Sequence, residues 1–312
     1  MSTSPRTLPG RVWLTEVGPR DGLQNEKQPV PAEIKIGLCE RLLAAGVTQL
    51  EATSFVSPKW VPQMSDAAQV MAGVERRAGL RVSVLTPNMK GFEGALAAGA
   101  DEVVIFGAAS EAFSQRNINC SIAESIERFR PVAEAAQANG MRVRAAVSVA
   151  FGCPYQGEVP IADVVDVTER FRDLGCDEIG IADTIGVGTA GQVKAVFEAA
   201  AKVFPLAQLS GHFHDTYGQG VANTLAALEV GVSHFDTSIA GLGGCPFAKG
   251  ATGNVATEDV VFLLHGLGIE TGLDLESLVR AGQWISEFLG RKSNSRVGNA
   301  IAVKLRESEQ AV

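Results

Sequence analysis

Two histidines separated by one residue, His212 and His214, stand in a short segment whose composition is typical of a β-strand. Alternate residues of a strand point to the same side, so these imidazoles would lie side by side and could share one metal ion. Further along the chain, residues 238–254 are rich in glycine and include a single cysteine, Cys245. This composition predicts a mobile loop that carries a thiol toward whatever the histidines bind. A metal site facing such a loop indicates an enzyme rather than a binding scaffold.

The expected ligand set favours particular metals. Two imidazoles together with carboxylate and amide oxygens suit a divalent ion that keeps open positions for a substrate. The cysteines form no CxxC pair and no thiolate-rich set, which argues against structural zinc. Oxygen ligands favour octahedral coordination, so we expect Mg²⁺ or Mn²⁺ rather than tetrahedral Zn²⁺.

Strand-like and helix-like segments alternate along the whole chain. The expected strands are 12–17, 48–53, 81–85, 102–106, 142–149, 178–182, 208–214 and 234–239. The expected helices include 32–45, 120–139, 161–174, 189–203 and 216–230, and glycines follow several of them. Eight such units fit a closed parallel barrel better than an open sheet, and residues 18–26 lack a dinucleotide-binding fingerprint. We therefore predict an α/β fold, a (β/α)8 TIM barrel in one domain over 1–312, with the barrel over about 12–270 and a helical extension over about 273–300.

Polar residues stand where several of the predicted strands end. In TIM barrels these ends form the active site, so residues remote in sequence would meet at one mouth. They are Arg20 and Asp21 after the first strand, Glu51 in the second, Asp183 and Thr184 after the sixth, and His212 and His214 on the seventh. Phe213 would face the outer helices. Asp183 could equally cap the turn that follows it.

Composition excludes several classes of function. The chain has 46% hydrophobic and 20% charged residues, which is ordinary for a globular enzyme. A net charge of −8 argues against binding to nucleic acid or to an anionic membrane. The odd number of cysteines and the absence of an export signal predict free thiols in the cytoplasm. Barrel enzymes commonly pair through their outer helices, so we expect a homodimer.

Five segments, taken together, closely resemble the 3-hydroxy-3-methylglutaryl-CoA (HMG-CoA) lyase family. They are 18–26 (GPRDGLQNE), 54–64 (SFVSPKWVPQM), 183–188 (DTIGVG), 212–219 (HFHDTYGQ) and 241–246 (GLGGCP). The likeness runs in order from about residue 12 to 289. It implies a divalent metal bound by Asp21, His212, His214 and Asn254. It also implies retro-Claisen cleavage of HMG-CoA to acetyl-CoA and acetoacetate, as in leucine breakdown and ketone-body formation.

The chemistry of that reaction explains the residue types. The bond between C2 and C3 breaks when the C3 hydroxyl loses its proton, for which Asp21 or a bound water is the candidate base. Arg20 would stabilise the enolate oxygen of acetyl-CoA, and Glu51 would orient Arg20. Cys245 would protonate the enolate carbon. Gln24, Asp183 and Thr184 are expected to contact the substrate or to support the site.

Coenzyme A carries several phosphate charges, so basic residues near the mouth are candidate contacts. They are Lys27, Lys249 and Lys292. Members of the family often carry Tyr-Ala-Gln-Gly after the Cys-Pro pair, whereas this chain has Phe-Ala-Lys-Gly over 247–250. The substrate contacts of the loop are therefore expected to differ.

Four other functions compete with this one. A lyase of the same kind could act on a longer-chain 3-hydroxyglutaryl-CoA. A synthase of the superfamily would condense acetyl-CoA with a 2-oxo acid, but such enzymes usually lack the cysteine loop. A metal-dependent hydrolase usually carries its His-x-His pair on the first strand, and here the pair ends the seventh. A non-catalytic barrel would have no need of polar residues gathered at one mouth.

Overall fold

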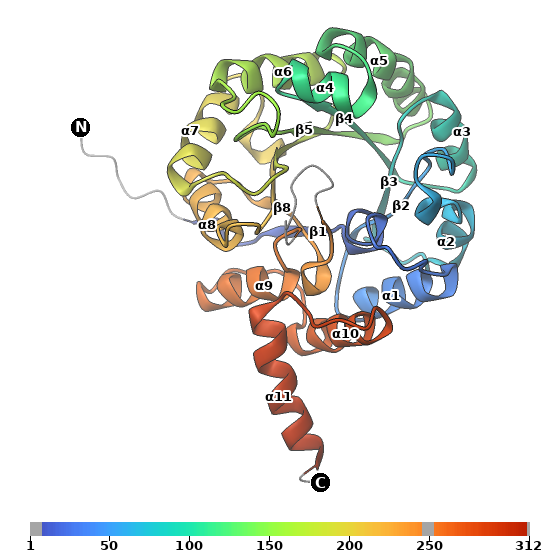
Figure 1. Cartoon of the computed structure of the whole chain (residues 1–312), viewed down its shortest axis with the longest axis vertical. Coiled ribbons are helices and arrows are strands. Elements are labelled where there is room, and N and C mark those ends of the chain that lie inside the picture. Colours follow the sequence, from blue (N-terminus) through green and yellow to red (C-terminus); the bar gives the residue numbers. More distant parts are fainter. Residues whose placement is uncertain (1–7, 245–252, 311–312) are drawn as a thin grey trace, which may run out of the picture.

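Eight parallel strands close into a barrel in chain order, and β1 pairs with β8 to complete it (Figure 1). The computed structural model describes residues 8–244 and 253–310. The strands are β1 (Trp13–Glu16), β2 (Gln49–Ser54), β3 (Arg81–Leu85), β4 (Glu102–Ala108), β5 (Arg142–Ser148), β6 (Glu178–Asp183), β7 (Leu209–Phe213) and β8 (His234–Thr237). Each boundary lies within two residues of the predicted one. The predicted TIM barrel is confirmed.

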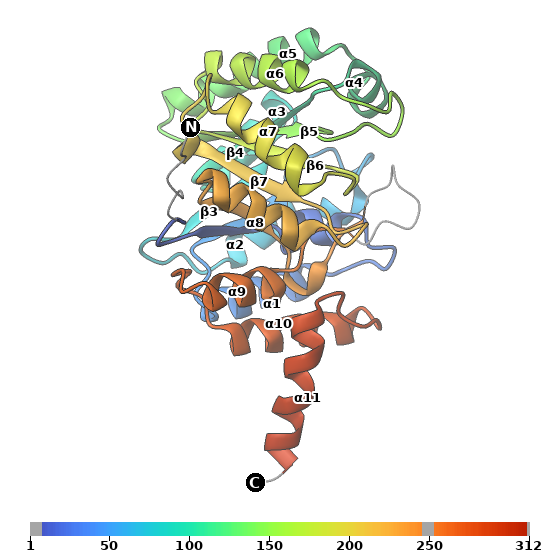
Figure 2. The same cartoon turned by 90° about the vertical axis from the view of Figure 1, so that its left-hand side faces the viewer.

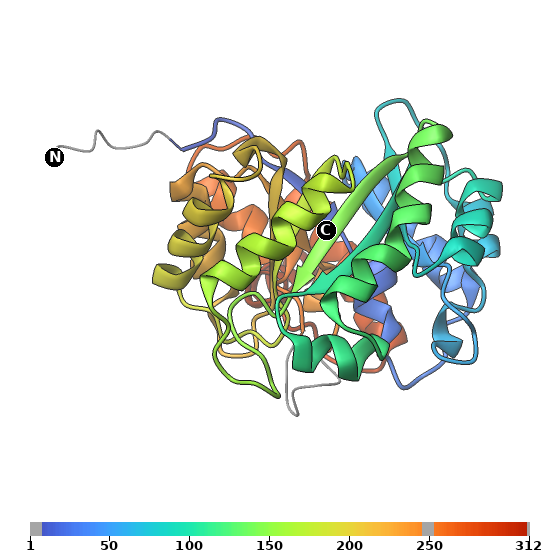
Figure 3. The same cartoon turned by 90° about the horizontal axis from the view of Figure 1, so that it is seen from above.

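Helices surround the barrel on the outside (Figure 2 and Figure 3). They are α1 (Ala32–Ala44), α2 (Ala67–Gly73), α3 (Met89–Ala97), α4 (Glu111–Ile118), α5 (Ile122–Ala138), α6 (Ile161–Asp173), α7 (Ala190–Ala200), α8 (Gly220–Val230), α9 (Thr257–Gly266), α10 (Leu275–Phe288) and α11 (Arg296–Gln310). Local sequence sets several of their ends. Ser121 and Glu124 form a capping box at the start of α5, and α8 stops at Gly231, whose φ of 108° suits glycine. None of the helices in the described part of the chain is long and apolar enough to cross a membrane.

The C-terminal extension differs from the prediction. We expected it to end near residue 300, but α11 continues to Gln310 and projects away from the barrel (Figure 1). Its start is fixed by a tertiary contact with α9. The Asp259 carboxylate accepts hydrogen bonds from the Ser295 hydroxyl at 2.7 Å and from the Val297 amide at 2.8 Å. Because Asp259 is remote in sequence, the local pattern did not indicate this helix.

Strand alternation decides which side chains reach the barrel interior. On β7, Ser210 faces the axis, where its hydroxyl accepts a hydrogen bond from Arg144 of β5 at 3.2 Å. Phe213 faces outward, as predicted, with its ring centroid 6.4 Å from that of Phe197 on α7. Arg144 is buried and forms ion pairs with Glu178 and Asp236. This buried network lies beneath the mouth of the barrel and holds the strands that carry the polar residues.

Candidate active site

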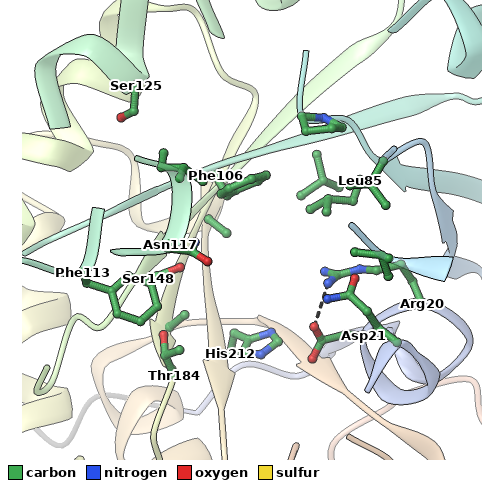
Figure 4. Close-up of a pocket in the computed structure, with 18 of the residues that line it drawn as sticks. Arg20, Asp21, Leu85, Phe106, Phe113, Asn117, Ser125, Ser148, Thr184 and His212 are labelled. Atoms are coloured by element: carbon green, nitrogen blue, oxygen red, sulfur yellow. Dashed lines mark hydrogen bonds and ion pairs between the residues drawn. The ribbon is translucent and has the colours of Figure 1, made fainter. Parts of the chain in front are cut away.

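A cavity of about 770 Å³ opens where the carboxyl ends of the strands meet (Figure 4). Its polar end is formed by Arg20, Asp21, Glu51, His212 and His214, which come from the β1 and β2 region and from β7. The strand-end rule thus brings together residues that are far apart in sequence. A cavity of this size is typical of a small-molecule site.

Asp21, His212 and His214 form a cluster that could hold a metal ion. Each offers one ligand atom, and these atoms lie within 4.8 Å of one another. The Nε2 atoms of the two histidines are 3.3 Å apart. The Asn254 side-chain amide donates to Asp21 Oδ2 at 2.8 Å. All four predicted ligands therefore lie in one place.

The donor atoms of this cluster fit a divalent cation. Asp236 Oδ2 lies 2.9 Å from His212 Nδ1. With a proton held on Nδ1 by this carboxylate, a neutral His212 would present the lone pair of its Nε2 to the cluster. Burial and the neighbouring His212 together lower the pKa of His214 to about 4, so His214 is a neutral imidazole near pH 7. Two imidazoles beside a carboxylate are a suitable set of ligands for such an ion.

Asp236 of β8 is a functional residue that the sequence analysis missed. Burial disfavours its charge, but Arg144 and His212 outweigh this effect and lower its pKa. Burial also disfavours the charged form of His212. The hydrogen bond to Asp236 and its negative charge outweigh this effect and raise the pKa of His212. The sequence did contain an indication of this role, because Asp236 lies in the eighth predicted strand, two residues after His234. In the structure Asp236 is the register partner of His212.

Replacing Asp236 by Asn is expected to weaken binding of Mn²⁺ by about 10- to 100-fold, because the orienting carboxylate of a metal-binding histidine is lost. Calorimetric titration with Mn²⁺ measures this effect. Asp173→Asn is the matched control, since Asp173 lies on the surface and pairs with Arg172. Equal affinity in the wild type and in Asp236→Asn would show that Asp236 does not orient the ligand.

Arg20 lies in a short π-helix, η1 (Gly18–Gly22), directly after β1. Its Nε donates to Glu51 Oε1 at 2.5 Å and its Nη1 donates to Asp21 Oδ1 at 2.7 Å. Burial disfavours the charge of Arg20, but Glu51 and Asp21 more than offset it and raise the Arg20 pKa. Burial also opposes ionisation of Asp21, yet Arg20 and the histidines hold its pKa well below the usual range. The guanidinium is thus fixed in a charged state at the polar end of the cavity.

The other predicted contacts, Gln24, Thr184 and Asp183, occupy different places. Gln24 lines the cavity, and its buried Oε1 has no hydrogen-bond partner within the described residues. Thr184 also lines the cavity, and its hydroxyl accepts from the Val149 amide at 2.8 Å. Asp183 points away and accepts from the amides of Val187 and Gly188 at 3.0 and 2.9 Å. Asp183 therefore caps a turn, which is the alternative interpretation given above, and does not line the cavity.

The base of the glycine-rich loop lies against the site. Gly243 and Gly253 have φ values of 130° and 91°, and a Cβ on Gly253 would lie 2.5 Å from the backbone of Gly243. Only glycine permits both this conformation and this approach. Gly244 lines the cavity, and its carbonyl accepts from the Asn25 amide group at 2.9 Å. Cys245 and Lys249 follow in sequence and lie outside the described residues.

The predicted coenzyme A contacts can be compared with the basic residues that line the cavity. Lys27 and Lys292 are exposed and do not line the cavity. Their chain segments lie together, because Arg291 Nη2 is 2.7 Å from Glu26 Oε1. Besides Arg20 and the buried Arg144, the cavity is lined by Arg116 of α4 and Arg128 of α5. They belong to helices that carry none of the family motifs, so nothing in the motif analysis indicated them.

The fold and the site define a TIM-barrel enzyme with a His–His–Asp cluster at its catalytic mouth. The HMGL-like family model matches residues 11–285. The chain is 56% identical to hydroxymethylglutaryl-CoA lyase, mitochondrial, of Homo sapiens, over 96% of this chain and 92% of that protein. It is also 56% identical to the 3-hydroxy-3-isohexenylglutaryl-CoA/hydroxy-methylglutaryl-CoA lyase of Pseudomonas aeruginosa, over 95% and 99%. A crystal structure of hydroxymethylglutaryl-CoA lyase from P. aeruginosa superposes with a TM-score of 0.94 at 56% identity, covering 95% of this chain and 99% of that one.

The chain belongs to the HMGL-like family. The resemblance seen in the sequence is thereby confirmed.

Proposed function

We propose that this protein cleaves HMG-CoA into acetyl-CoA and acetoacetate. The observation that carries the proposal is the contact of the Asp21–His212–His214 cluster with the Arg20–Glu51 ion pair in one cavity. Relatives named for this activity are 54–56% identical to the chain over nearly all of its length. The competing hydrolase and scaffold hypotheses account for neither fact.

Asp21, His212, His214 and Asn254 would hold the metal, which we propose to be Mg²⁺ or Mn²⁺. When bound, such an ion polarises the hydroxyl and carboxylate oxygens of a substrate and lowers the pKa of the hydroxyl. Asp21 accepts hydrogen bonds from both Arg20 and Asn254, and its lowered pKa makes it a weak base. We therefore assign Asp21 chiefly to ligation, with a water molecule carrying the hydroxyl proton past it to solvent.

Cleavage leaves acetyl-CoA as an enolate, which needs a positive partner at oxygen and a proton at carbon. Arg20 is the charged donor at the polar end of the cavity, and Glu51 fixes its Nε. We assign Arg20 to the enolate oxygen, with Gln24 as a further donor to the substrate through its amide group. Cys245 follows Gly244 in the chain and supplies the proton to carbon.

Several less direct assignments belong to the same proposal. Lys27, Lys249 and Lys292 contact the phosphates of coenzyme A outside the cavity. The protein is a cytoplasmic homodimer, although the human relative is named as mitochondrial. The described cysteines are all buried free thiols, which suits a reducing compartment. They are Cys39, Cys120, Cys153 and Cys176.

The test of the proposal is to strip the purified protein of metal and assay HMG-CoA with and without added Mg²⁺ or Mn²⁺. We expect acetyl-CoA and acetoacetate to appear in equal amounts and only when the ion is present. If neither product appears with any divalent ion, the substrate assignment is wrong.

Replacing His214 by Ala is expected to remove stoichiometric metal, because the cluster loses one of its two imidazole ligands. Elemental analysis after gel filtration measures bound metal directly. His265→Ala is the control, since His265 is exposed on α9 and contacts Thr271. Full metal retention in His214→Ala would exclude His214 as a ligand.

A further inference from the structure

The last residue of β1, Glu16, is a buried acid that joins three segments of the chain. It is 1% exposed and does not line the cavity. Its Oε1 accepts hydrogen bonds from the amides of Gly18 and Ile239, both at 2.8 Å, and its Oε2 accepts from the Thr257 hydroxyl at 2.6 Å. These donors belong to η1, to a short 3-10 turn, η4 (Ile239–Gly241), and to the start of α9. One carboxylate therefore holds together segments that are far apart in sequence.

Two of these segments carry proposed ligands of the metal. The η1 turn begins at Gly18 and contains Asp21, and α9 begins at Thr257, three residues after Asn254. The Asn254 side-chain amide donates to Asp21 Oδ2 at 2.8 Å. Because the same carboxylate binds the first residue of η1 and the first residue of α9, it fixes the two sides of this contact relative to each other.

The third segment, η4, leads into the glycine-rich loop. Ala240 within it has a φ of 56°, a conformation that is unfavourable for residues other than glycine. Its amide donates to both carboxylate oxygens of Glu258, at 3.1 and 3.0 Å, and its carbonyl accepts from the Asn294 amide at 2.9 Å. These bonds hold the shape of η4. The bond from Ile239 to the β1 carboxylate then determines where the chain enters the segment that ends at Gly244, beside the cavity.

An ionisable side chain is a costly choice for this buried position. Burial raises the pKa of Glu16 to about 7, although the hydrogen bonds from Thr257, Ile239 and Gly18 oppose the shift. Acids whose pKa is perturbed in this way are common at functional sites. The three donors need an acceptor of the right length, so the geometry of the side chain should matter more than its charge.

We propose that Glu16 is a positioning residue for the cleavage reaction, and that its carboxylate sets the place of Arg20 and Asp21 relative to Asn254 and to the start of the glycine-rich loop. Glu16 contacts neither the substrate nor the metal and acts through the backbone of η1 and η4. A displacement of about 1 Å between reacting groups can lower a rate by about 100-fold. The inference rests on the proposed function for its effect on cleavage, whereas its effect on the metal ligands can be measured without that function.

The experiment compares Glu16→Gln with Glu16→Asp. Glutamine keeps the length of the side chain, and its carbonyl oxygen can accept from the Gly18 and Ile239 amides. Its NH₂ group would face the Thr257 hydroxyl, which can accept from it and donate to the Thr237 hydroxyl 2.9 Å away. Aspartate keeps the charge but is one methylene shorter, so it cannot reach all three donors. A geometric role therefore favours the glutamine variant, and a role of the charge favours the aspartate variant.

Steady-state kinetics with HMG-CoA at saturating Mn²⁺ give the first readout. We expect kcat of Glu16→Gln to stay within about threefold of the wild type and kcat of Glu16→Asp to fall by about 10- to 100-fold, with KM changed by less than about threefold. Circular dichroism at the assay temperature gives the folded fraction by which kcat is corrected. Phe171→Ala is the control for lost stability, because it removes a fully buried ring on α6 that does not line the cavity. It should lower Tm and leave the corrected kcat unchanged.

Calorimetric titration of the metal-free protein with Mn²⁺ gives a second readout that needs no turnover. Glu16→Asp should bind Mn²⁺ about 10-fold more weakly, because Asp21 and Asn254 are no longer held in place. Glu16→Gln and Phe171→Ala should bind it as the wild type does. A residue that only stabilises the fold would not change the affinity of the folded protein in this selective way.

Two results would overturn the inference. Wild-type kcat and Mn²⁺ affinity in Glu16→Asp would mean that Glu16 positions nothing, and an equal loss in Glu16→Gln would mean that charge rather than geometry is required. If the wild type does not cleave HMG-CoA, the proposed function fails, and the Mn²⁺ titrations alone decide whether Glu16 positions the ligands. If Glu16→Asp does not fold, Thr257→Val takes its place, since it removes one of the three hydrogen bonds, and should lower kcat by about three- to tenfold.

Discussion

Arg20→Met is expected to lower kcat by about three powers of ten, with KM for HMG-CoA changed much less, because the guanidinium stabilises charge that develops only during cleavage. Arg20 is positioned for this by Glu51 at 2.5 Å and by Asp21 at 2.7 Å. Arg20→Lys should lower kcat by almost as much. A lysine keeps the charge but lacks the planar guanidinium, which can donate hydrogen bonds to two carboxylates and to the substrate at the same time.

Steady-state kinetics at saturating metal measure this effect. Because Arg20 also contacts Asp21, the proposed metal ligand, Mn²⁺ affinity must be titrated in the same variants, so that loss of metal is separated from loss of the oxyanion partner. Arg76→Met is the control, since Arg76 pairs with Asp101 on the surface. Near-normal kcat in either Arg20 variant would remove Arg20 from the chemistry.

Cys245→Ser is expected to reduce cleavage almost to background. The enolate carbon needs a proton, and a serine hydroxyl is a far weaker acid than a thiol. The neighbouring chain supports this role. Gly244 lines the cavity and is tied to Asn25, and the positive φ values of Gly243 and Gly253 fix both ends of the loop beside Asn254.

Two measurements test Cys245. Turnover of Cys245→Ser is compared with that of Cys120→Ala, since Cys120 is a buried thiol outside the cavity. Alkylation of the wild-type protein should inactivate it, and bound substrate should slow the inactivation. Wild-type rates in Cys245→Ser would mean that another group protonates the enolate.

The sequence by itself determined the barrel and the place of the two histidines at the end of its seventh strand. Strand positions follow from local composition and from glycines at helix ends, which are short-range properties. The period of two along β7 decided that His212 faces the site and Phe213 the helices, because alternation does not depend on partners elsewhere. The strand-end rule and the family motifs then brought Asp21 and Asn254 to the same cluster.

Only the tertiary structure decided which groups support that cluster and what surrounds it. Asp236 contacts His212 because β7 and β8 are neighbours in a particular register, and Arg144 reaches Asp236 across the barrel. The α11 helix starts where it does because of Asp259 on α9. Each of these features is a contact between segments that are far apart in the sequence. Local sequence patterns cannot predict such contacts, because they depend on how the whole chain folds.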